Sequence, residues 1–412
     1  MNFGFLNEDV KIPLRRFLAV AFLFSSTFAW FYLFHIFLLD KIFVSLEPLK
    51  LIYFGKALFY ISIVFSAIIG SLIGEKVERR KLLWSWIAFG VLTTASLAVF
   101  QGVLFSLLFS ALLGASFGLG FPSCLAFLAD STAIEERARV SGVLFFITLT
   151  MVPLLLLFSS LLNLGVVELV LLALILRASS FFALLIDPCA RETGKEKSWL
   201  TILASKDFVL YLFPWLIFNI ANGLTAFVKL PESLDFQSAS AIGATLKFVS
   251  ASIVALISGV LADRFGRKNP IIIGLSMLGV SYLLLGVLGI SPTSWLVIMT
   301  TQGIAWGVIA VSYFLAVLGD LSSSGGSKER FYVLGGIIPL VMVMLFSGVS
   351  DLYKLNPPTN PLSSALGILI IVSIYPILRA SETLPETKIR ERRLREHVQK
   401  VGKLAEESRK TN

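Results

Sequence analysis

The stretch Gly259–Lys268 reads GVLADRFGRK, and a worn copy, SLIGEKVERR, occupies Ser71–Arg80, 188 residues earlier. Each copy closes one long apolar run and precedes another. Each is therefore expected to form a charged hairpin between two hydrophobic helices. Because the hairpin occurs once in each half of the chain, it indicates a duplicated membrane body.

The composition is that of a membrane protein. Hydrophobic residues make up 56% of the 412 positions, charged residues only 15%, and the mean hydropathy is +0.86. A soluble chain of this length needs far more charge to cover its surface. The first apolar run, from about Phe17, is too long for a cleavable signal and is expected to be the first membrane helix.

Counting apolar runs of about 20 residues predicts twelve spans. They lie near 17–39, 51–74, 82–101, 104–129, 139–161, 165–187, 208–229, 240–262, 269–289, 295–319, 330–350 and 360–380. The termini and alternate loops hold 28 of the 35 Lys and Arg residues, and the opposite loops hold four. This asymmetry predicts a plasma-membrane protein with both termini in the cytoplasm. Because the positive charge is confined to one set of loops, the net charge of +9 does not indicate a nucleic-acid-binding surface.

Further landmarks repeat with nearly one period. Asp130 recurs as Asp320 and Gly142 as Gly335, at offsets of 190 to 193 residues. The sequence therefore predicts an all-α membrane protein built from two pseudo-symmetric six-helix bundles. The expected parts are a first bundle at 1–187, a linker with a small interfacial helix at 188–207, a second bundle at 208–381 and a charged cytoplasmic tail at 382–412.

The two hairpins resemble the loop 2–3 and loop 8–9 signature of the major facilitator superfamily, although Glu75 stands in the first copy where the pattern has aspartate. That resemblance implies a solute carrier whose charged loops latch the cytoplasmic side closed and release it when the carrier opens inward. The residues at the matching positions and at the starts of the fifth and eleventh spans are Glu75, Arg79, Glu136, Arg137, Asp263, Arg264, Arg267, Glu329 and Arg330. The alternative is that these basic loops only hold the helices in orientation.

Ionisable residues inside a span are costly, so each one is a candidate site residue. In this chain they are His35, Lys56, Arg177 and Lys247. Lys247 is expected either to pair with an anionic or polyhydroxylated substrate or to reach water along its helix. His35 is expected either to titrate during transport or to bond a neighbouring carbonyl. Arg177 has no evident partner.

No Asp or Glu falls in the middle of the first, second, fourth, fifth, seventh, eighth, tenth or eleventh span. A carrier of organic cations usually needs a buried carboxylate to pair with its cargo, and proton-coupled carriers commonly use one that titrates. The absence argues against both, and it leaves open whether an ion is coupled to transport.

Uncharged polar and aromatic side chains form stripes on three spans. The stripes are Ser26 and Trp30 on the first, Trp215, Asn219 and Asn222 on the seventh, and Gln302, Trp306 and Tyr313 on the tenth. The superfamily resemblance implies that these spans line the central path. Amides and indoles suit hydroxyl-bearing or aromatic cargo, so the stripes predict a substrate cavity. Bonding between helices is the alternative.

The predicted function is a transporter, secondary active or facilitative, of a sugar, polyol or organic anion by alternating access. Leu384–Lys388 reads LPETK, which is similar to the ending of sugar porters. Drug–proton antiporters of this fold carry an arginine in the fourth span, whereas here no arginine lies between Arg80 and Arg137, which argues against that branch. An efflux permease for drugs or metabolites, a membrane enzyme acting on lipid and a transporter-like sensor are the alternatives. Two cysteines and two histidines give no basis for a metal or cofactor, and a monomer is expected.

Overall fold

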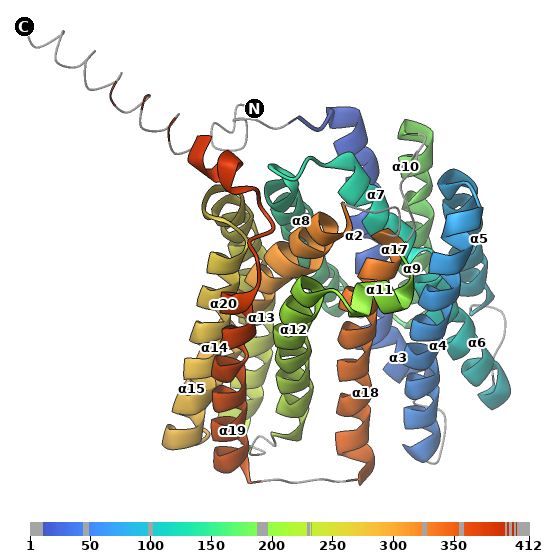
Figure 1. Cartoon of the computed structure of the whole chain (residues 1–412). Coiled ribbons are helices and arrows are strands. Elements are labelled where there is room, and N and C mark those ends of the chain that lie inside the picture. The colour runs from blue at the N-terminus through green and yellow to red at the C-terminus, as the bar shows by residue number, and fades with distance from the viewer. Residues whose placement is uncertain are drawn as a thin grey trace, which may run out of the picture.

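The computed structural model describes residues 11–43, 49–97, 102–187, 197–228, 231, 233–323, 328–353 and 358–391, together with 394, 398 and 401. Every element in these residues is a helix (Figure 1). Ten of the described helices are long and apolar enough to cross a membrane. The chain is an all-helical membrane protein, as predicted.

The first half of the chain contains six helical segments, some of them interrupted. They are α2 (Leu14–Leu33) with η1 (Phe34–Leu38) and α3 (Leu39–Phe43), α4 (Leu49–Lys76), α5 (Arg79–Ser96), α6 (Val103–Gly118) with α7 (Phe121–Ser131), α8 (Arg137–Leu161), and α9 (Val166–Ser179) with α10 (Phe181–Ile186). A short helix, α11 (Trp199–Leu203), lies in the predicted linker, and the Ser198 hydroxyl caps it by accepting from the Thr201 amide at 3.1 Å.

The second half repeats the arrangement. Its segments are α12 (Lys206–Leu224) with η2 (Thr225–Phe227), α13 (Leu234–Phe265), α14 (Lys268–Leu288), α15 (Pro292–Ile309) with η3 (Ala310–Val317) and α16 (Leu318–Ser322), α17 (Lys328–Tyr332) with η4 (Val333–Ile337) and α18 (Ile338–Tyr353), and α19 (Thr359–Val372) with α20 (Ile374–Arg379). The η1, η3 and η4 segments are π-helical, so each widens one turn of a membrane helix.

Two connections between helices are built as their residues require. Gly289 ends α14 with φ at +76°, and Asn163 holds φ at +48° between α8 and α9. Both angles lie in the left-handed region, which glycine and asparagine tolerate best. Ser291 then starts α15 with a capping box to Ser294.

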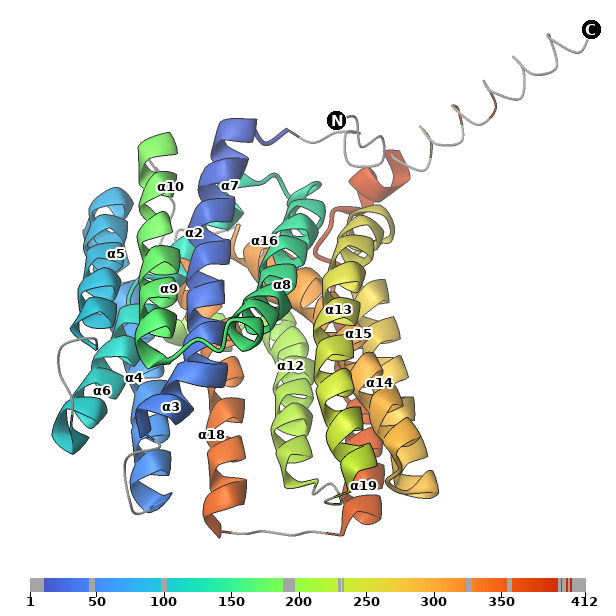
Figure 2. The same ribbon diagram turned by 180° about the vertical axis from the view of Figure 1, so that it is seen from behind.

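The two halves meet along two pairs of helices, α8 with α13 and α18 with α4 (Figures 1 and 2). Two glycines let α8 and α13 approach closely. A β-carbon on Gly259 would lie 2.5 Å from the Ala138 carbonyl oxygen, and one on Gly142 would lie 2.6 Å from the Ala255 oxygen. These glycines, one in the charged-hairpin signature and one in the repeat, are therefore required by the contact between the halves.

The loops α4–α5, α7–α8 and α13–α14 lie at one end of the bundle, which we call the charged face (Figures 1 and 2). The described residues nearest both chain ends also lie there. The Lys11 amide donates to the Glu136 carboxylate, and the Lys388 ammonium lies 3.6 Å from the Glu135 carboxylate. Both described ends are therefore on one side, as an even number of spans requires.

Candidate functional site

A cavity of about 470 Å³ lies between the two halves. Its walls are mainly aromatic and aliphatic. The first half contributes Phe28, Tyr32, His35, Ile36, Phe145 and Leu149, and the second half contributes Trp215, Asn222, Gly223, Ala244, Lys247, Phe248, Ala251, Met299, Trp306, Ala310, Phe314, Leu340, Val343 and Met344. Five of the ten predicted substrate-binding residues are among them, namely His35, Trp215, Asn222, Lys247 and Trp306.

Lys247 is the most distinctive group in the cavity wall. Helix α13 begins at Leu234, earlier than the predicted start near residue 240, so Lys247 lies about three and a half turns from its end rather than two. No Asp or Glu is among the lining residues, and in the described part of the chain no hydrogen-bond acceptor or carboxylate is found for the ammonium. The cavity therefore presents a positive charge that no described residue compensates.

The indoles of Trp215 and Trp306 form the aromatic wall opposite the first half. Trp306 Nε1 donates to Asn222 Oδ1 at 3.2 Å, which fixes the orientation of both side chains. Trp215 stacks on Tyr313 at 5.2 Å between ring centroids and meets Trp306 edge-on at 5.9 Å. The buried Trp215 Nε1 has no hydrogen-bond partner among the described residues.

His35 reaches the cavity from the widened turn η1. Its Nδ1 lies 2.5 Å from the Tyr60 hydroxyl, and its ring stacks on Phe31 at 5.9 Å with an interplanar angle of 6°. The imidazole is thus held in one orientation by a ring and a hydroxyl of its own half. It is the only histidine among the lining residues.

Two predicted residues of the first half do not line this cavity. The Ser26 hydroxyl lies 2.7 Å from the Ser180 hydroxyl, and Trp30 Nε1 donates to Thr94 Oγ1 at 3.1 Å. Both side chains are buried inside the first half. They join helices of one bundle to one another, which is the alternative weighed for them from the sequence.

Three predicted residues of the second half also lie away from the cavity wall. Asn219 Nδ2 donates to the carbonyl of Trp215, one turn earlier, at 2.7 Å. Gln302 Nε2 donates to the Tyr282 hydroxyl at 2.7 Å, and the Tyr313 hydroxyl donates to the Gly335 carbonyl at 3.1 Å. The last two bonds tie neighbouring helical segments of the second half together, whereas the first lies within α12.

Most of the lining residues gave no signal in the sequence. Phe28, Tyr32 and Phe248 stand among 35 Phe and 9 Tyr residues, most of which pack in cores or face the membrane. An aromatic residue without a polar neighbour at helical spacing does not reveal which side of its helix faces a cavity.

Ion pairs join the two halves across the charged face. Glu75 pairs with Arg330, Arg79 Nη2 lies 3.3 Å from Glu329 Oε1, and all four side chains are at most 12% exposed. Arg79 Nη1 also lies 2.7 Å from Asp130 Oδ2. The first two pairs each have one partner in each half. They can therefore form only while the halves are closed at this face.

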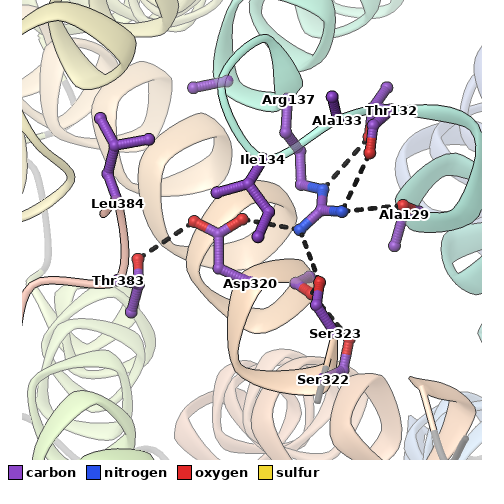
Figure 3. A network of polar contacts seen from close by, with 12 residues as sticks. Ala129, Thr132, Ala133, Ile134, Arg137, Asp320, Ser322, Ser323, Thr383 and Leu384 are labelled. Atoms are coloured by element: carbon purple, nitrogen blue, oxygen red, sulfur yellow. Dashed lines mark hydrogen bonds and ion pairs between the residues drawn. The ribbon is translucent and has the colours of Figure 1, made fainter. Parts of the chain in front are cut away.

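Asp320 is the centre of a second group of contacts at this face (Figure 3). Its Oδ1 accepts from Arg137 Nη1 of the other half at 2.6 Å, and its Oδ2 accepts from Arg267 Nε at 3.0 Å and from Thr383 Oγ1 at 3.1 Å. Arg137 Nη2 also donates to the Ala129 and Thr132 carbonyls at 2.8 and 3.1 Å. A single carboxylate therefore connects the two halves and the segment after the last helix.

The Asp263 carboxylate, near the end of α13, lies against the N-terminus of α8, which belongs to the other half. Its two oxygens accept from the Ala138 and Arg139 amides at 3.3 and 3.0 Å, and Oδ2 also accepts from Arg139 Nε at 3.0 Å. The positive end of the helix dipole favours a carboxylate there. Burial disfavours the charged form of Arg267, but Asp320 and Asp263 outweigh it and raise the pKa of that guanidinium.

One predicted latch residue, Glu136, bonds within its own half. Glu136 accepts from the Ile12 amide at 3.2 Å and from the Ala133 amide at 3.1 Å, both in its own half. Arg264 is half-buried at the end of α13. Conversely, Asp130, Asp320, Arg139 and Lys328 pair at this face without having been chosen from the sequence. The 190-residue spacing of Asp130 and Asp320 was the available signal.

Comparison with known proteins gives the family. Residues 17–328 match the family model of the Major Facilitator Superfamily, and no curated protein matches the chain. The crystal structure of the human organic anion transporter MFSD10 (TETRAN) is similar with a TM-score of 0.66 and 13% identity, covering 89% of this chain and 100% of that one. At this identity the likeness shows the fold. Because the family match spans well over half of the sequence, this protein belongs to the Major Facilitator Superfamily of transmembrane transporters.

Proposed function

We propose that this protein carries a small organic anion with an apolar or aromatic body across the cell membrane by alternating access. The observation that carries the proposal is the Lys247 ammonium, which faces the cavity between the halves without a partner among the described residues. A charge left uncompensated at membrane depth is costly, and an anionic ligand would compensate it.

The rest of the lining fits the body of such a ligand. Rings of Phe28, Phe248 and Trp215 offer apolar faces, while the Trp215 indole donor and the Asn222 amide offer few polar contacts. A sugar or polyol would bring several hydroxyls that need partners, and this lining supplies few. An organic cation would meet Lys247 and no carboxylate.

The charged face supports the transport cycle. Glu75, Arg79 and Arg137 of the first half pair with Arg330, Glu329 and Asp320 of the second, which closes the cavity toward that face. Opening there requires these pairs to separate. The excess of Lys and Arg in the loops of this face assigns it to the cytoplasm. On this proposal, the carrier is closed toward the cytoplasm.

The test is uptake into proteoliposomes of three compounds with one aromatic body, 1-naphthylacetate, 1-naphthylacetamide and 1-naphthylethylamine. The anion is expected to be carried in preference to the amide and the amine. Lys247→Met keeps the length of the side chain and removes its charge. A charge-assisted hydrogen bond contributes about 2 kcal/mol net, so the variant is expected to weaken anion binding by about thirtyfold.

The matched control is Lys56→Met, which removes an intramembrane lysine that does not line the cavity. It is expected to leave the preference for the anion unchanged. Anion uptake by Lys247→Met equal to that of the unmodified protein would refute the assignment. Equal uptake of the amide and the anion would instead favour an efflux permease for neutral apolar compounds, the second candidate that the aromatic lining supports.

A further inference from the structure

Arg177 in α9 is a fully buried cation that lies outside the cavity. It has no exposed surface, and no carboxylate pairs with it in the described part of the chain. Its Nε has no hydrogen-bond partner among those residues. A guanidinium keeps its charge, so burying it without an anion is costly unless dipoles and rings replace the missing charge.

The first half provides such a setting. The Arg177 guanidinium carbon lies 4.1 Å from the centroid of the Trp86 ring and 5.4 Å from that of Trp30, which are cation–π distances. Nη1 donates to Thr27 Oγ1 at 3.1 Å. A β-carbon on Gly90 would lie 2.1 Å from Arg177 Nε, so the glycine provides the space that the side chain fills.

Arg177 Nη2 donates to the Trp86 carbonyl at 3.4 Å, and its shorter contact meets an interruption of the fourth helical segment. Helix α6 ends at Gly118 and α7 begins at Phe121. In an unbroken helix the Gly120 amide would donate to the Ser116 carbonyl. Here that carbonyl accepts from Arg177 Nη2 at 3.0 Å. A cation at the C-terminal end of a helix also suits the helix dipole, so Arg177 replaces the hydrogen bond that the interruption removes.

Stacked rings connect this interruption to the cavity wall. Phe117 stacks on Phe31 at 4.5 Å and on Phe121 at 4.6 Å between centroids. Phe31 stacks on His35, and Phe121 meets Phe28 edge-on at 5.3 Å. Both His35 and Phe28 line the cavity. A shift of the residues flanking the interruption would therefore move the wall that the first half contributes.

We propose that Arg177 is a positioning residue of the transport cavity, which holds the α6–α7 interruption through the Ser116 carbonyl and so fixes the ring stack behind His35 and Phe28. The residue acts from within one half and touches neither the ligand nor the ion pairs of the charged face. Its role does not depend on which solute the carrier takes.

The experiment is hydrogen–deuterium exchange of the detergent-purified, full-length protein with Arg177→Met and Arg177→Lys. Arg177→Met is expected to speed exchange about tenfold in peptides spanning residues 117–124 and 28–35, with α8 and the second half unchanged. Arg177→Lys keeps the charge but not the planar fork of the guanidinium. Its exchange rate is therefore expected to lie between those of the unmodified protein and Arg177→Met. Binding of 1-naphthylacetate is expected to weaken in the same order.

Two further variants keep the test decisive. Thr27→Val removes one hydrogen bond to Arg177 and is expected to speed exchange about threefold in the same peptides. It tests the proposal if Arg177→Met does not fold. Arg379→Met, which removes an exposed arginine 5.4 Å from the Tyr375 ring, is the control and is expected to change nothing. Unchanged exchange at 117–124, or a uniform rise across the first half, would overturn the proposal. If 1-naphthylacetate does not bind the unmodified protein, the proposed substrate fails and the exchange result still decides the role of Arg177.

Discussion

Replacing Asp320 with asparagine should shift the carrier toward the conformation that is open at the charged face. The substitution keeps the size of the side chain and removes its charge. Asp320 accepts from Arg137 of the other half at 2.6 Å and from Arg267 of its own half at 3.0 Å, and both arginines are almost fully buried. Only the first contact depends on the two halves being closed.

The size of the shift follows from these contacts. Removing one partner of a buried ion pair costs about 3–5 kcal/mol. Arg137 keeps the carbonyls of Ala129 and Thr132 in its own half, so the low end, about 3 kcal/mol, applies. The loss at Arg267 is common to both conformations and cancels. The ratio of closed to open molecules should therefore fall by about 150-fold.

The assay is pulsed electron–electron double resonance between spin labels at Lys81→Cys and Asn269→Cys, one exposed position on each half at the charged face. The background carries Cys124→Ala and Cys189→Ser. A second labelled pair, Leu104→Cys and Val287→Cys, reports the opposite face. The variant should lengthen the first distance and shorten the second.

The control is Glu386→Gln, which removes an exposed pair with Arg390 in which the side chains are 76% and 78% exposed. Such a pair contributes about 0–1 kcal/mol, so the distances should not change. If folded Asp320→Asn protein gave the distance distributions of the unmodified protein at both faces, Asp320 would not hold the halves together.

Two more substitutions test the packing. Gly259→Val would place a β-carbon 2.5 Å from the Ala138 carbonyl oxygen, so α8 and α13 must separate. The free energy of unfolding should therefore fall by about 1–3 kcal/mol in a thermal or denaturant melt. An unchanged melt would mean that the helices are not in close contact. Gln302→Leu should lower the free energy of unfolding by about 1–2 kcal/mol because the buried Tyr282 hydroxyl loses a donor, yet leave 1-naphthylacetate affinity unchanged. Half-buried Thr301→Val, whose hydroxyl bonds only within its own helix, is its control, and a change in affinity with Gln302→Leu would place that residue in the cavity after all.

The helices and their order could be predicted because each depends on local sequence. The fifth span was expected at 139–161 and α8 runs from Arg137 to Leu161; the tenth was expected at 295–319 and its segments run from Pro292 to Ser322. Hydrocarbon excludes unpaired backbone groups, so any apolar run of this length forms a helix wherever its neighbours lie.

The cavity could be predicted only in part, because helical periodicity gives the faces of a helix but not what each face meets. Trp306 and Tyr313 share a face at 3.6 residues per turn, yet Tyr313 lies in the π-helical segment Ala310–Val317, whose wider turns change that register. Trp306 lines the cavity, whereas Tyr313 bonds to the Gly335 carbonyl of its own half.

By itself the sequence predicted an all-helical membrane protein and its family, since hydropathy and a repeated motif are properties of the chain in order. The tertiary structure alone decided that Lys247 faces a cavity while Arg177 lies behind one, and that Asp320 joins the two halves. Each of these depends on which helices lie side by side. The cost of burying a charge is set by the partners that those helices bring to it, and separation along the chain does not specify them.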